Sequence, residues 1–311
     1  MRKPHGRLRR RMTMKHVFLV NPAAGRGDAL QTVRDIAAGK KDCEIYEMRS
    51  GEDAADYVRS RCADSEEELC FVACGGDGTI NAVASGAALQ PKACMTVLPL
   101  GSGNDFVKAF GGKQRFLDAE ALLAAEPQPI DILKVGDRWA VNAFHFGLDS
   151  AVAETMNRVK SKPIIGGANA YPTGVVKALV CNMRTWCRMK VDGEDFNNGD
   201  ILLCTVANGQ YVGGSYRCAP RSLCDDGMAE ICLVRPVSRI RFLSLMNSYK
   251  AGNHLEDPRL KPVISYRRGK VIEVVGKPGF AVSLDGEIVK GERFRVEVVH
   301  GGLRFAVPEE R

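Results

Sequence analysis

The sequence predicts an α/β domain followed by a β-rich, sandwich-like domain. In the first half, three short apolar runs, residues 17–20, 69–73 and 95–100, each end in a glycine-bearing loop and lead into a helical pattern. Such strand–loop–helix units build an open α/β sheet. After residue 135, strand-like runs alternate with turns rich in Gly, Pro, Asp and Asn, as in antiparallel sheets. The 311 residues are enough for two cores of ordinary size.

The segment 74–81, Cys-Gly-Gly-Asp-Gly-Thr-Ile-Asn, has the layout of a phosphate site. Its glycines allow the backbone to turn with positive φ and to approach a ligand closely, and the N–H groups at the start of the next helix point at an anion. Asp77 would repel a phosphate unless a cation lies between them, so we interpret it as an indirect magnesium partner. The alternative for this segment alone is an ordinary glycine-rich turn.

Two further loops repeat this arrangement. Segment 101–106 reads Gly-Ser-Gly-Asn-Asp-Phe, and segment 21–27 reads Asn-Pro-Ala-Ala-Gly-Arg-Gly. Ligands in open α/β sheets bind at the carboxyl ends of strands, so we expect the three loops to converge on one site. The usual nucleotide fingerprints, G-x-x-x-x-G-K-[ST] and an early G-x-G-x-x-G, are absent from the sequence.

These motifs, together with Ala219-Pro220, Asp225-Asp226-Gly227 and the Leu-Asp-Gly-Glu segment 284–287, resemble in this order the motif set of the diacylglycerol kinase catalytic family, in its soluble bacterial lipid-kinase branch. The resemblance spans about residues 15 to 307. It implies a nucleotide-binding domain over 15–135, similar to NAD kinases and phosphofructokinases, and a β-rich lipid-binding domain over 136–311 whose last strands return toward the first domain. Residues 134–138 are the expected hinge.

By this resemblance, ATP and Mg²⁺ are the expected cofactors. The glycine loops and Thr79 would hold phosphates, and Asn81 and Ser102 would help to hold the nucleotide. Asp77 and Asp105, with Asp131 as a further candidate, would shape a water-linked magnesium network. The predicted nucleotide-binding residues are Asn21, Pro22, Gly25, Gly75, Gly76, Asp77, Gly78, Thr79, Ile80, Asn81, Ser102 and Asp105.

The Asp-Asp-Gly turn at 225–227 is the candidate metal site of the second domain. Carbonyls and a carboxylate in such a turn can coordinate a hard cation, although this tripeptide is more often an ordinary turn. The resemblance implies a structural magnesium on the carbonyl of Leu223, the carboxylate of Asp226 and the carbonyl of Met228.

The Leu-Asp-Gly-Glu segment carries the candidate base. Phosphoryl transfer to an alcohol needs a positioned hydroxyl and an acceptor for its proton, and a carboxylate supplies both. A hairpin turn would also explain Asp-Gly without chemistry. With the resemblance, Glu287 is the first choice for the proton acceptor and Asp285 the second, and Asp77 completes the predicted catalytic set.

Charge and cysteine content indicate the setting. Lys and Arg number 44 against 37 Asp and Glu, and the excess lies in residues 1–15, so the rest of the chain is formally neutral and argues against nucleic-acid binding. We expect residues 1–14 to be a disordered basic tail; such an arm could also help the enzyme visit anionic lipid. The eleven dispersed cysteines predict reduced thiols and hence a cytoplasmic protein. A peripheral association with the inner face of the membrane is left open. A homodimer is left open.

Two features have competing interpretations. Val176, Leu179, Val180 and Met183 fall at helical spacing among basic residues, which suits either an interfacial helix that meets lipid or a domain-packing helix. No window of the sequence suits a membrane span, because the most apolar one, 164–181, contains Asn, Pro, Lys and several glycines. His145 is either catalytic or, as we expect, a hydrogen-bonded core histidine.

The sequence thus predicts a lipid kinase that transfers the γ-phosphate of ATP to a primary hydroxyl, with diacylglycerol as the first choice of acceptor and phosphatidic acid as product. The alternatives are a sphingoid-base or other lipid kinase, an NAD kinase, and a catalytically silent nucleotide- or lipid-binding regulator. NAD kinases share Gly-Gly-Asp-Gly but need a second acceptor motif, and the intact acids argue against a silent regulator.

Overall fold

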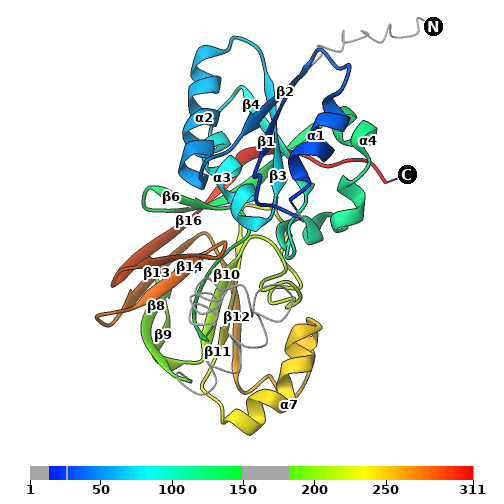
Figure 1. Ribbon diagram of the computed structural model, residues 1–311. Coiled ribbons are helices and arrows are strands. Elements are labelled where there is room, and N and C mark those ends of the chain that lie inside the picture. The colour runs from blue at the N-terminus through cyan, green and yellow to red at the C-terminus, as the bar shows by residue number, and fades with distance from the viewer. Residues whose placement is uncertain (1–13, 26, 149–182, 311) are drawn as a thin grey trace, which may run out of the picture.

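The computed structural model describes residues 14–25, 27–148 and 183–310, which form two domains stacked one above the other (Figure 1). In the first, helices flank a parallel sheet; in the second, two antiparallel sheets pack face to face. The predicted fold class, α/β followed by a β-rich sandwich-like domain, is confirmed.

The first domain repeats a strand–helix unit. Its elements are β1 (Lys15–Val20), α1 (Ala29–Ala37), β2 (Cys43–Glu47), α2 (Gly51–Asp64), β3 (Leu69–Gly75), α3 (Asp77–Ala87) and β4 (Ala93–Pro99). The strands pair in parallel in the order β2-β1-β3-β4, and β3 and β4 are buried along their whole length. Near-continuous apolar strands covered on both faces are typical of parallel sheets. The order places β3 between β1 and β4, so the loops after these three strands meet at one edge.

Short elements lead out of this sheet. Two 3₁₀ helices, η1 (Phe106–Phe110) and η2 (Lys113–Phe116), and α4 (Ala119–Ala124) precede the long strand β5 (Pro127–Val135) and β6 (Arg138–Ala140). Residues 134–138, the expected hinge, form a β-hairpin in which Val135 pairs with Arg138, and Gly136 turns the chain with φ +59°.

The second domain is a sandwich. One layer, here called sheet B, runs β12 (Ile264–Gly269), β11 (Ala229–Val234), β10 (Leu203–Ala207), β7 (Ala143–Gly147), β14 (Ala281–Leu284), β15 (Glu287–Lys290). The other layer, part of sheet A, contains β8 (Thr185–Val191), β9 (Glu194–Ile201), β13 (Val271–Gly276) and β16 (Arg293–Ala306). Alternate side chains of the two layers form the core between them. Helix α7 (Arg239–Lys250) and η3 (Asn253–Leu255) lie between β11 and β12 in the sequence.

Strand β16 belongs to both domains, and Figure 1 shows it running from the sandwich up into the first domain. Phe305 pairs in parallel with Met95 of β4, and Thr96 Oγ1 donates a 2.8 Å hydrogen bond to the carbonyl of Ala306. The ring of Phe305 packs against those of Phe106, Phe110 and Phe116. Sheet A is therefore one continuous sheet through the whole molecule, and it fixes the two domains relative to each other.

The apolar stripe that includes Val176, Leu179 and Val180 lies outside the described residues, and so does the basic tail apart from Met14. In the part of the chain that the structure describes, no helix is long and apolar enough to cross a membrane.

Candidate active site

The three glycine loops meet at the carboxyl ends of β1, β3 and β4. The N–H of Asn21 donates to the carbonyl of Cys74 at 3.1 Å, and the N–H groups of Leu100 and Gly101 donate to the carbonyl of Gly75 at 2.9 and 3.1 Å. Asn21 Nδ2 also lies 3.5 Å from Thr79 Oγ1. The expected convergence of these loops is thus what the structure contains.

Glycine is required where these loops touch. A Cβ on Gly101 would lie 2.4 Å from the Cα of Gly76, and a Cβ on Gly75 would lie 2.2 Å from Thr79 Oγ1. Gly25 adopts φ +68°, and Gly78 at the start of α3 has open space where a Cβ would stand. The first two glycines allow close packing of backbone, and Gly78 leaves the amino end of α3 accessible to an anion.

The other predicted nucleotide-binding residues differ in their surroundings. Pro22 and Ser102 are exposed on the loops, so both are accessible to a ligand. Ile80 is only 1% exposed and packs in the core of the first domain. Its side chain therefore packs α3 against the core, and any contact with a nucleotide would be through its backbone.

Asp77 and Asp105 lie together behind these loops. The N–H of Asp105 donates to Asp77 Oδ1 at 2.6 Å, and a Cβ on Gly103 would lie 2.6 Å from Asp77 Oδ2. Burial, and then the charge of Asp105, raises the pKa of Asp77 to about 6. A pair of acids in this environment favours a proton or a cation between or beside them.

Asp105 also joins the first domain to the second. Its carboxylate accepts from the N–H of Gly214 at 2.9 and 3.1 Å, and Lys108 Nζ donates to it at 2.5 Å. Lys108 Nζ donates in turn to the carbonyl of Gly214 at 2.6 Å. The sequence reasoning missed Lys108 and Gly214. Gly213-Gly214 is a double glycine like Gly75-Gly76, and that pattern could have drawn attention to it.

Asp285 is held by four donors. Its carboxylate accepts from Asn81 Nδ2 at 2.8 Å and from the N–H groups of Val141, Asn142 and Ala143 at 2.7, 3.1 and 2.7 Å. Burial raises its pKa, while these donors favour the ionised form. The residue adopts φ +47° in the tight β14–β15 turn, followed by Gly286 at φ +97°. Asp285 therefore ties α3 of the first domain to the β6–β7 segment of the second.

Glu287 is more exposed than these acids. It begins β15, its side chain is 62% exposed, and its Oε1 accepts a 2.5 Å hydrogen bond from Arg138 Nη1. Of the two candidates for the proton acceptor, Asp285 has its oxygens occupied by donors, and Glu287 is open to solvent. Arg138, which the sequence reasoning did not single out, anchors Glu287 from the β5–β6 hairpin.

Asp131 is not placed with Asp77 and Asp105. It is fully buried, and its carboxylate accepts from the N–H of Gly227 at 2.6 Å, the N–H of Gly301 at 2.9 Å and His300 Nδ1 at 2.7 Å. The N–H of Asp131 donates to the carbonyl of Cys224. Asp131 thus organises the 223–228 turn, away from the predicted magnesium network.

The same turn was the predicted structural metal site. Asp226 Oδ1 accepts from the N–H of Met228 at 3.1 Å, and Asp226 Oδ2 is paired with Arg268. Leu223 is exposed. Within the described residues, no group of three or more His, Cys, Asp or Glu side chains is arranged to hold a metal. In this arrangement the Asp226 carboxylate is paired with a guanidinium, so Mg²⁺ would have to displace Arg268 to bind there.

Comparison with known proteins agrees with this architecture. The model of the diacylglycerol kinase catalytic domain matches residues 15–135, and that of the YegS C-terminal NAD kinase beta sandwich-like domain matches residues 142–307. A relative named "Probable lipid kinase YegS-like" from Pseudomonas fluorescens is 30% identical over 260 residues, which cover 83% of this chain and 81% of that protein. The chain belongs to the diacylglycerol kinase catalytic family. It is a lipid kinase of the YegS-like branch.

Other family members support the same assignment over nearly the whole length. A relative of the same name from Pseudomonas savastanoi is 27% identical over 305 residues, 96% of this chain and 95% of that protein. The crystal structure of a diacylglycerol kinase from Bacillus anthracis superposes with a TM-score of 0.67 at 21% identity, covering 94% of this chain and 96% of that one. A second structure from that organism reaches a TM-score of 0.74 at 24% identity. The two structures share the fold of this chain.

Proposed function

We propose that this lipid kinase transfers the γ-phosphoryl group of ATP to the primary hydroxyl of a neutral lipid, with diacylglycerol as the acceptor. One observation carries the proposal: the acids Asp77, Asp105 and Asp285 lie where the glycine loops meet sheet B, and the other end of sheet B carries an apolar pocket. The molecule thus presents, in spatial order, a phosphate site, an acid cluster and an apolar pocket. This order suits a substrate with a hydroxyl head and acyl chains.

The donor side of the site suits ATP. Phosphates placed at the amino end of α3 would meet the N–H groups of Gly76 and Gly78, with no side-chain cap at Gly76 in competition. Lys108, 25% exposed beside Asp105, adds positive charge. The raised pKa of Asp77 supports a cation at this position, and Mg²⁺, when bound, would neutralise charge on the transferring phosphoryl group.

The acceptor side divides two tasks between two carboxylates. Asp285 positions the site, because its four hydrogen bonds lock Asn81 and the 141–143 backbone in place. Glu287 is the proton acceptor, since it is exposed and, within the described residues, accepts its hydrogen bond from Arg138 at Oε1. The lipid hydroxyl would give its proton to Glu287 as its oxygen attacks the γ-phosphorus, and the bond from that phosphorus to the bridging oxygen would break to release ADP. Because the transition state is loose, positioning and charge stabilisation supply most of the rate.

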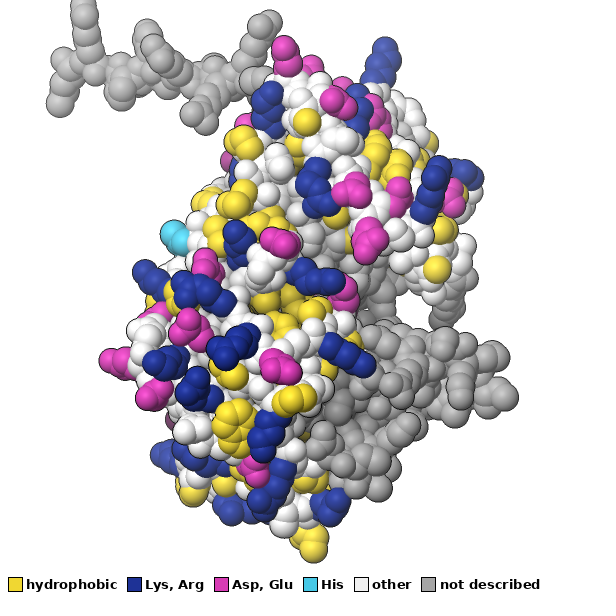
Figure 2. Space-filling model, turned by 90° about the vertical axis from the view of Figure 1, so that its left-hand side faces the viewer, with side chains coloured by type: hydrophobic (Ala, Val, Ile, Leu, Met, Phe, Trp, Pro, Cys, Tyr) yellow, Lys and Arg dark blue, Asp and Glu magenta, His cyan; other side chains and the backbone are white. Residues whose placement is uncertain are grey.

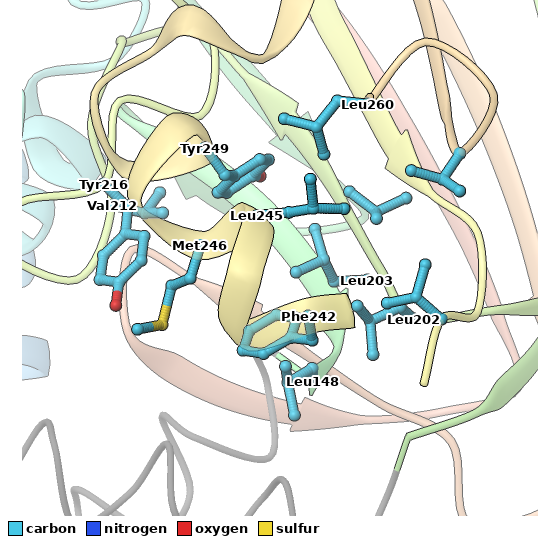
Figure 3. Close-up of a pocket in the computed structure, with 13 residues that line it drawn as sticks. Leu148, Leu202, Leu203, Val212, Tyr216, Phe242, Leu245, Met246, Tyr249 and Leu260 are labelled. Atoms are coloured by element: carbon cyan, nitrogen blue, oxygen red, sulfur yellow. The ribbon is translucent and has the colours of Figure 1, made fainter. Parts of the chain in front are cut away.

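An apolar pocket between α7 and sheet B offers a place for an acyl chain (Figure 3). Leu203 and Val234 supply its floor from β10 and β11, and Phe242, Leu245 and Met246 of α7 supply its wall. The space is lined by apolar side chains and is in part open to solvent. Clefts of this apolar character bind apolar ligands.

The outer surface of α7 is suited to an anionic membrane. Ile240 and Leu243 are 83% and 55% exposed, and Arg239 and Arg241 lie beside them in the sequence. Exposed aliphatic side chains with neighbouring bases are what an interfacial helix needs. On the face drawn in Figure 2, Lys and Arg are interspersed with Asp and Glu over the second domain. Electrostatic attraction to an anionic membrane would therefore come from local groups of bases and not from the whole face. A membrane contact at α7 would bring the apolar pocket to the lipid.

The experiment is ATP-dependent phosphorylation of diacylglycerol, sphingosine and NAD in mixed micelles, read by mass spectrometry. We expect phosphatidic acid as the main product. Sphingosine 1-phosphate as the main product would keep the mechanism and change the acceptor. NADP with no phosphorylated lipid would overturn the proposal.

A further inference from the structure

Among the residues that the structure describes, two neighbouring buried polar side chains of sheet B have no hydrogen-bond partner. They are His145, at Nδ1, on β7 and Ser283, at Oγ, on β14. They are direct cross-strand partners, which places their Cβ atoms about 4.5–5.5 Å apart. His145 is 8% exposed and Ser283 is fully buried. Unpaired buried polar groups are uncommon and costly, so two of them side by side require an explanation. His145 is also not the hydrogen-bonded core histidine that the sequence suggested.

Both side chains point away from the core of the sandwich. Their neighbours Phe144 and Phe146 on β7, and Val282 and Leu284 on β14, belong to that core. Because side chains alternate along a strand, His145 and Ser283 lie on the opposite, outer face of sheet B. Thr205 of β10 is the cross-strand partner of His145 on its other side and shares this face.

This outer face leads from the acids to the apolar pocket. At one end of β7, the N–H of Ala143 donates to Asp285, and just beyond the other end Leu148 lines the pocket. His145 lies between them, about 7 Å along the strand from Ala143. On β10, Thr205 likewise precedes Ala207 and follows Leu203, which also lines the pocket. The negative charge of Asp105 acts on the pKa of His145, so the two groups lie within electrostatic reach.

We propose that His145 and Ser283 bind the ester group of the lipid acceptor, between the hydroxyl that is phosphorylated and the acyl chain in the pocket. The inference rests on the proposed function and specifies how the acceptor is recognised. In diacylglycerol the ester carbonyls stand a few bonds from the free hydroxyl, and the acyl chains follow. That order of groups, hydroxyl, ester and hydrocarbon, matches the order acids, polar pair and apolar pocket along sheet B.

The polar pair suits a neutral acceptor better than an amine. His145 is held neutral, because burial lowers its pKa to about 4, and Ser283 is an uncharged hydroxyl. Both can donate a hydrogen bond to a carbonyl oxygen. An ammonium group at the same place would have no carboxylate directly across the strands, since Ser283, His145 and Thr205 carry none, and only the through-space charge of Asp105 would act on it. A buried charge without a partner is strongly unfavourable.

The test compares two acceptors in mixed micelles: diacylglycerol, which carries esters, and oleyl alcohol, which has a primary hydroxyl and a chain but no ester. The quantity measured is the ratio of their kcat/KM values, because a ratio cancels losses of folded protein. We expect Ser283→Ala and His145→Phe each to lower this ratio about tenfold, through diacylglycerol alone, as the loss of one hydrogen bond implies. Ser60→Ala, on the exposed side of α2, is the matched control and should leave the ratio unchanged.

The Ser283 variant also tests whether its unpaired hydroxyl contributes to stability. Since Ser283 Oγ has no partner, Ser283→Ala should melt no lower than the wild type without lipid, which separates a binding role from a structural one. Phosphorylation of diacylglycerol with an unchanged ratio in both variants would overturn this inference and leave the proposed function intact. No phosphorylated lipid from any acceptor would overturn both.

Discussion

The backbone N–H of Asp105 donates a 2.6 Å hydrogen bond to the carboxylate of Asp77. This contact joins the loop after β4 to the start of α3 and sets two acids side by side behind the glycine loops. Burial and the negative charge of Asp105 raise the pKa of Asp77 to about 6, although the hydrogen bond itself acts in the opposite direction.

Asp77→Asn should abolish most activity and increase stability at neutral pH. The folded-state pKa of about 6 lies above the ordinary value of 3.8, so the stability that protonated Asp77 contributes is complete below about pH 4 and is lost as the pH rises through 6. In EDTA, thermal melts of the two proteins should coincide at pH 4. At pH 7.5 the variant should be more stable by about 1–2 kcal/mol. Full turnover by folded Asp77→Asn would contradict its role in catalysis.

Glu287→Gln and Asp285→Asn should separate the base from the positioning residue. Glu287 is exposed, so its amide variant should keep the melting temperature and lose about 10²–10⁴-fold in kcat. Asp285→Asn turns a donating amide toward N–H groups, so it should lower the free energy of unfolding by about 1–3 kcal/mol as well as reduce activity. If Asp285→Asn kept its stability and Glu287→Gln kept its activity, the two roles would have to be exchanged.

Much of this site is visible in the sequence. The phosphate loops could be located because glycine and short apolar strands have strong local signatures, and the expected runs 17–20 and 69–73 lie within β1 and β3. Local patterns say nothing about which distant groups meet. Asp131 was therefore grouped with Asp77, although it binds the turn at Gly227, and Arg268 could not be foreseen as the partner of Asp226. The hairpin at residues 134–138 was likewise not foreseen, because the pairing of Val135 with Arg138 leaves little trace in composition.

Arg268 and its neighbour Arg267 offer a matched pair for testing the second domain. Arg268 pairs with Glu230, which is 2% exposed, whereas Arg267 pairs with the exposed Glu194. Arg268→Met should lower the free energy of unfolding by about 1–3 kcal/mol at pH 7.5, and Arg267→Met by much less.

The pH dependence of this effect has a definite sign. Burial raises the pKa of Glu230 and Arg268 opposes that shift, so removal of Arg268 leaves a buried charge that a proton can neutralise. The cost of Arg268→Met should therefore shrink as the pH falls toward 4, measured by urea unfolding. An equal loss of unfolding free energy in both arginine variants at all pH values would contradict the pairing of Arg268 with buried Glu230.

Thermal melts with and without Mg²⁺ test the 223–228 turn itself. We expect Mg²⁺ to change the melting temperatures of the wild type and of Asp226→Ala by the same amount.

Ile240→Asp and Leu243→Asp should impair membrane contact without impairing chemistry. Both side chains are exposed on α7, and an added carboxylate there would oppose an anionic surface. Binding to vesicles that contain anionic lipid should fall several-fold in sedimentation, and activity toward a short-chain, detergent-dispersed diacylglycerol should stay within twofold of wild type. Leu89→Asp in the first domain, also an exposed leucine, is the control. Unchanged vesicle binding in both α7 variants would remove this helix from the membrane contact.

The most direct test of the account follows the γ-phosphate itself. The protein is incubated with ATP labelled at the γ-phosphate, Mg²⁺ and micelles that contain both diacylglycerol and NAD, and the label is then divided between the organic and aqueous phases and identified. The account predicts label in phosphatidic acid with the wild type and about 10²-fold less with Glu287→Gln. Label confined to NADP, or phosphatidic acid formed equally fast by Glu287→Gln, would contradict it.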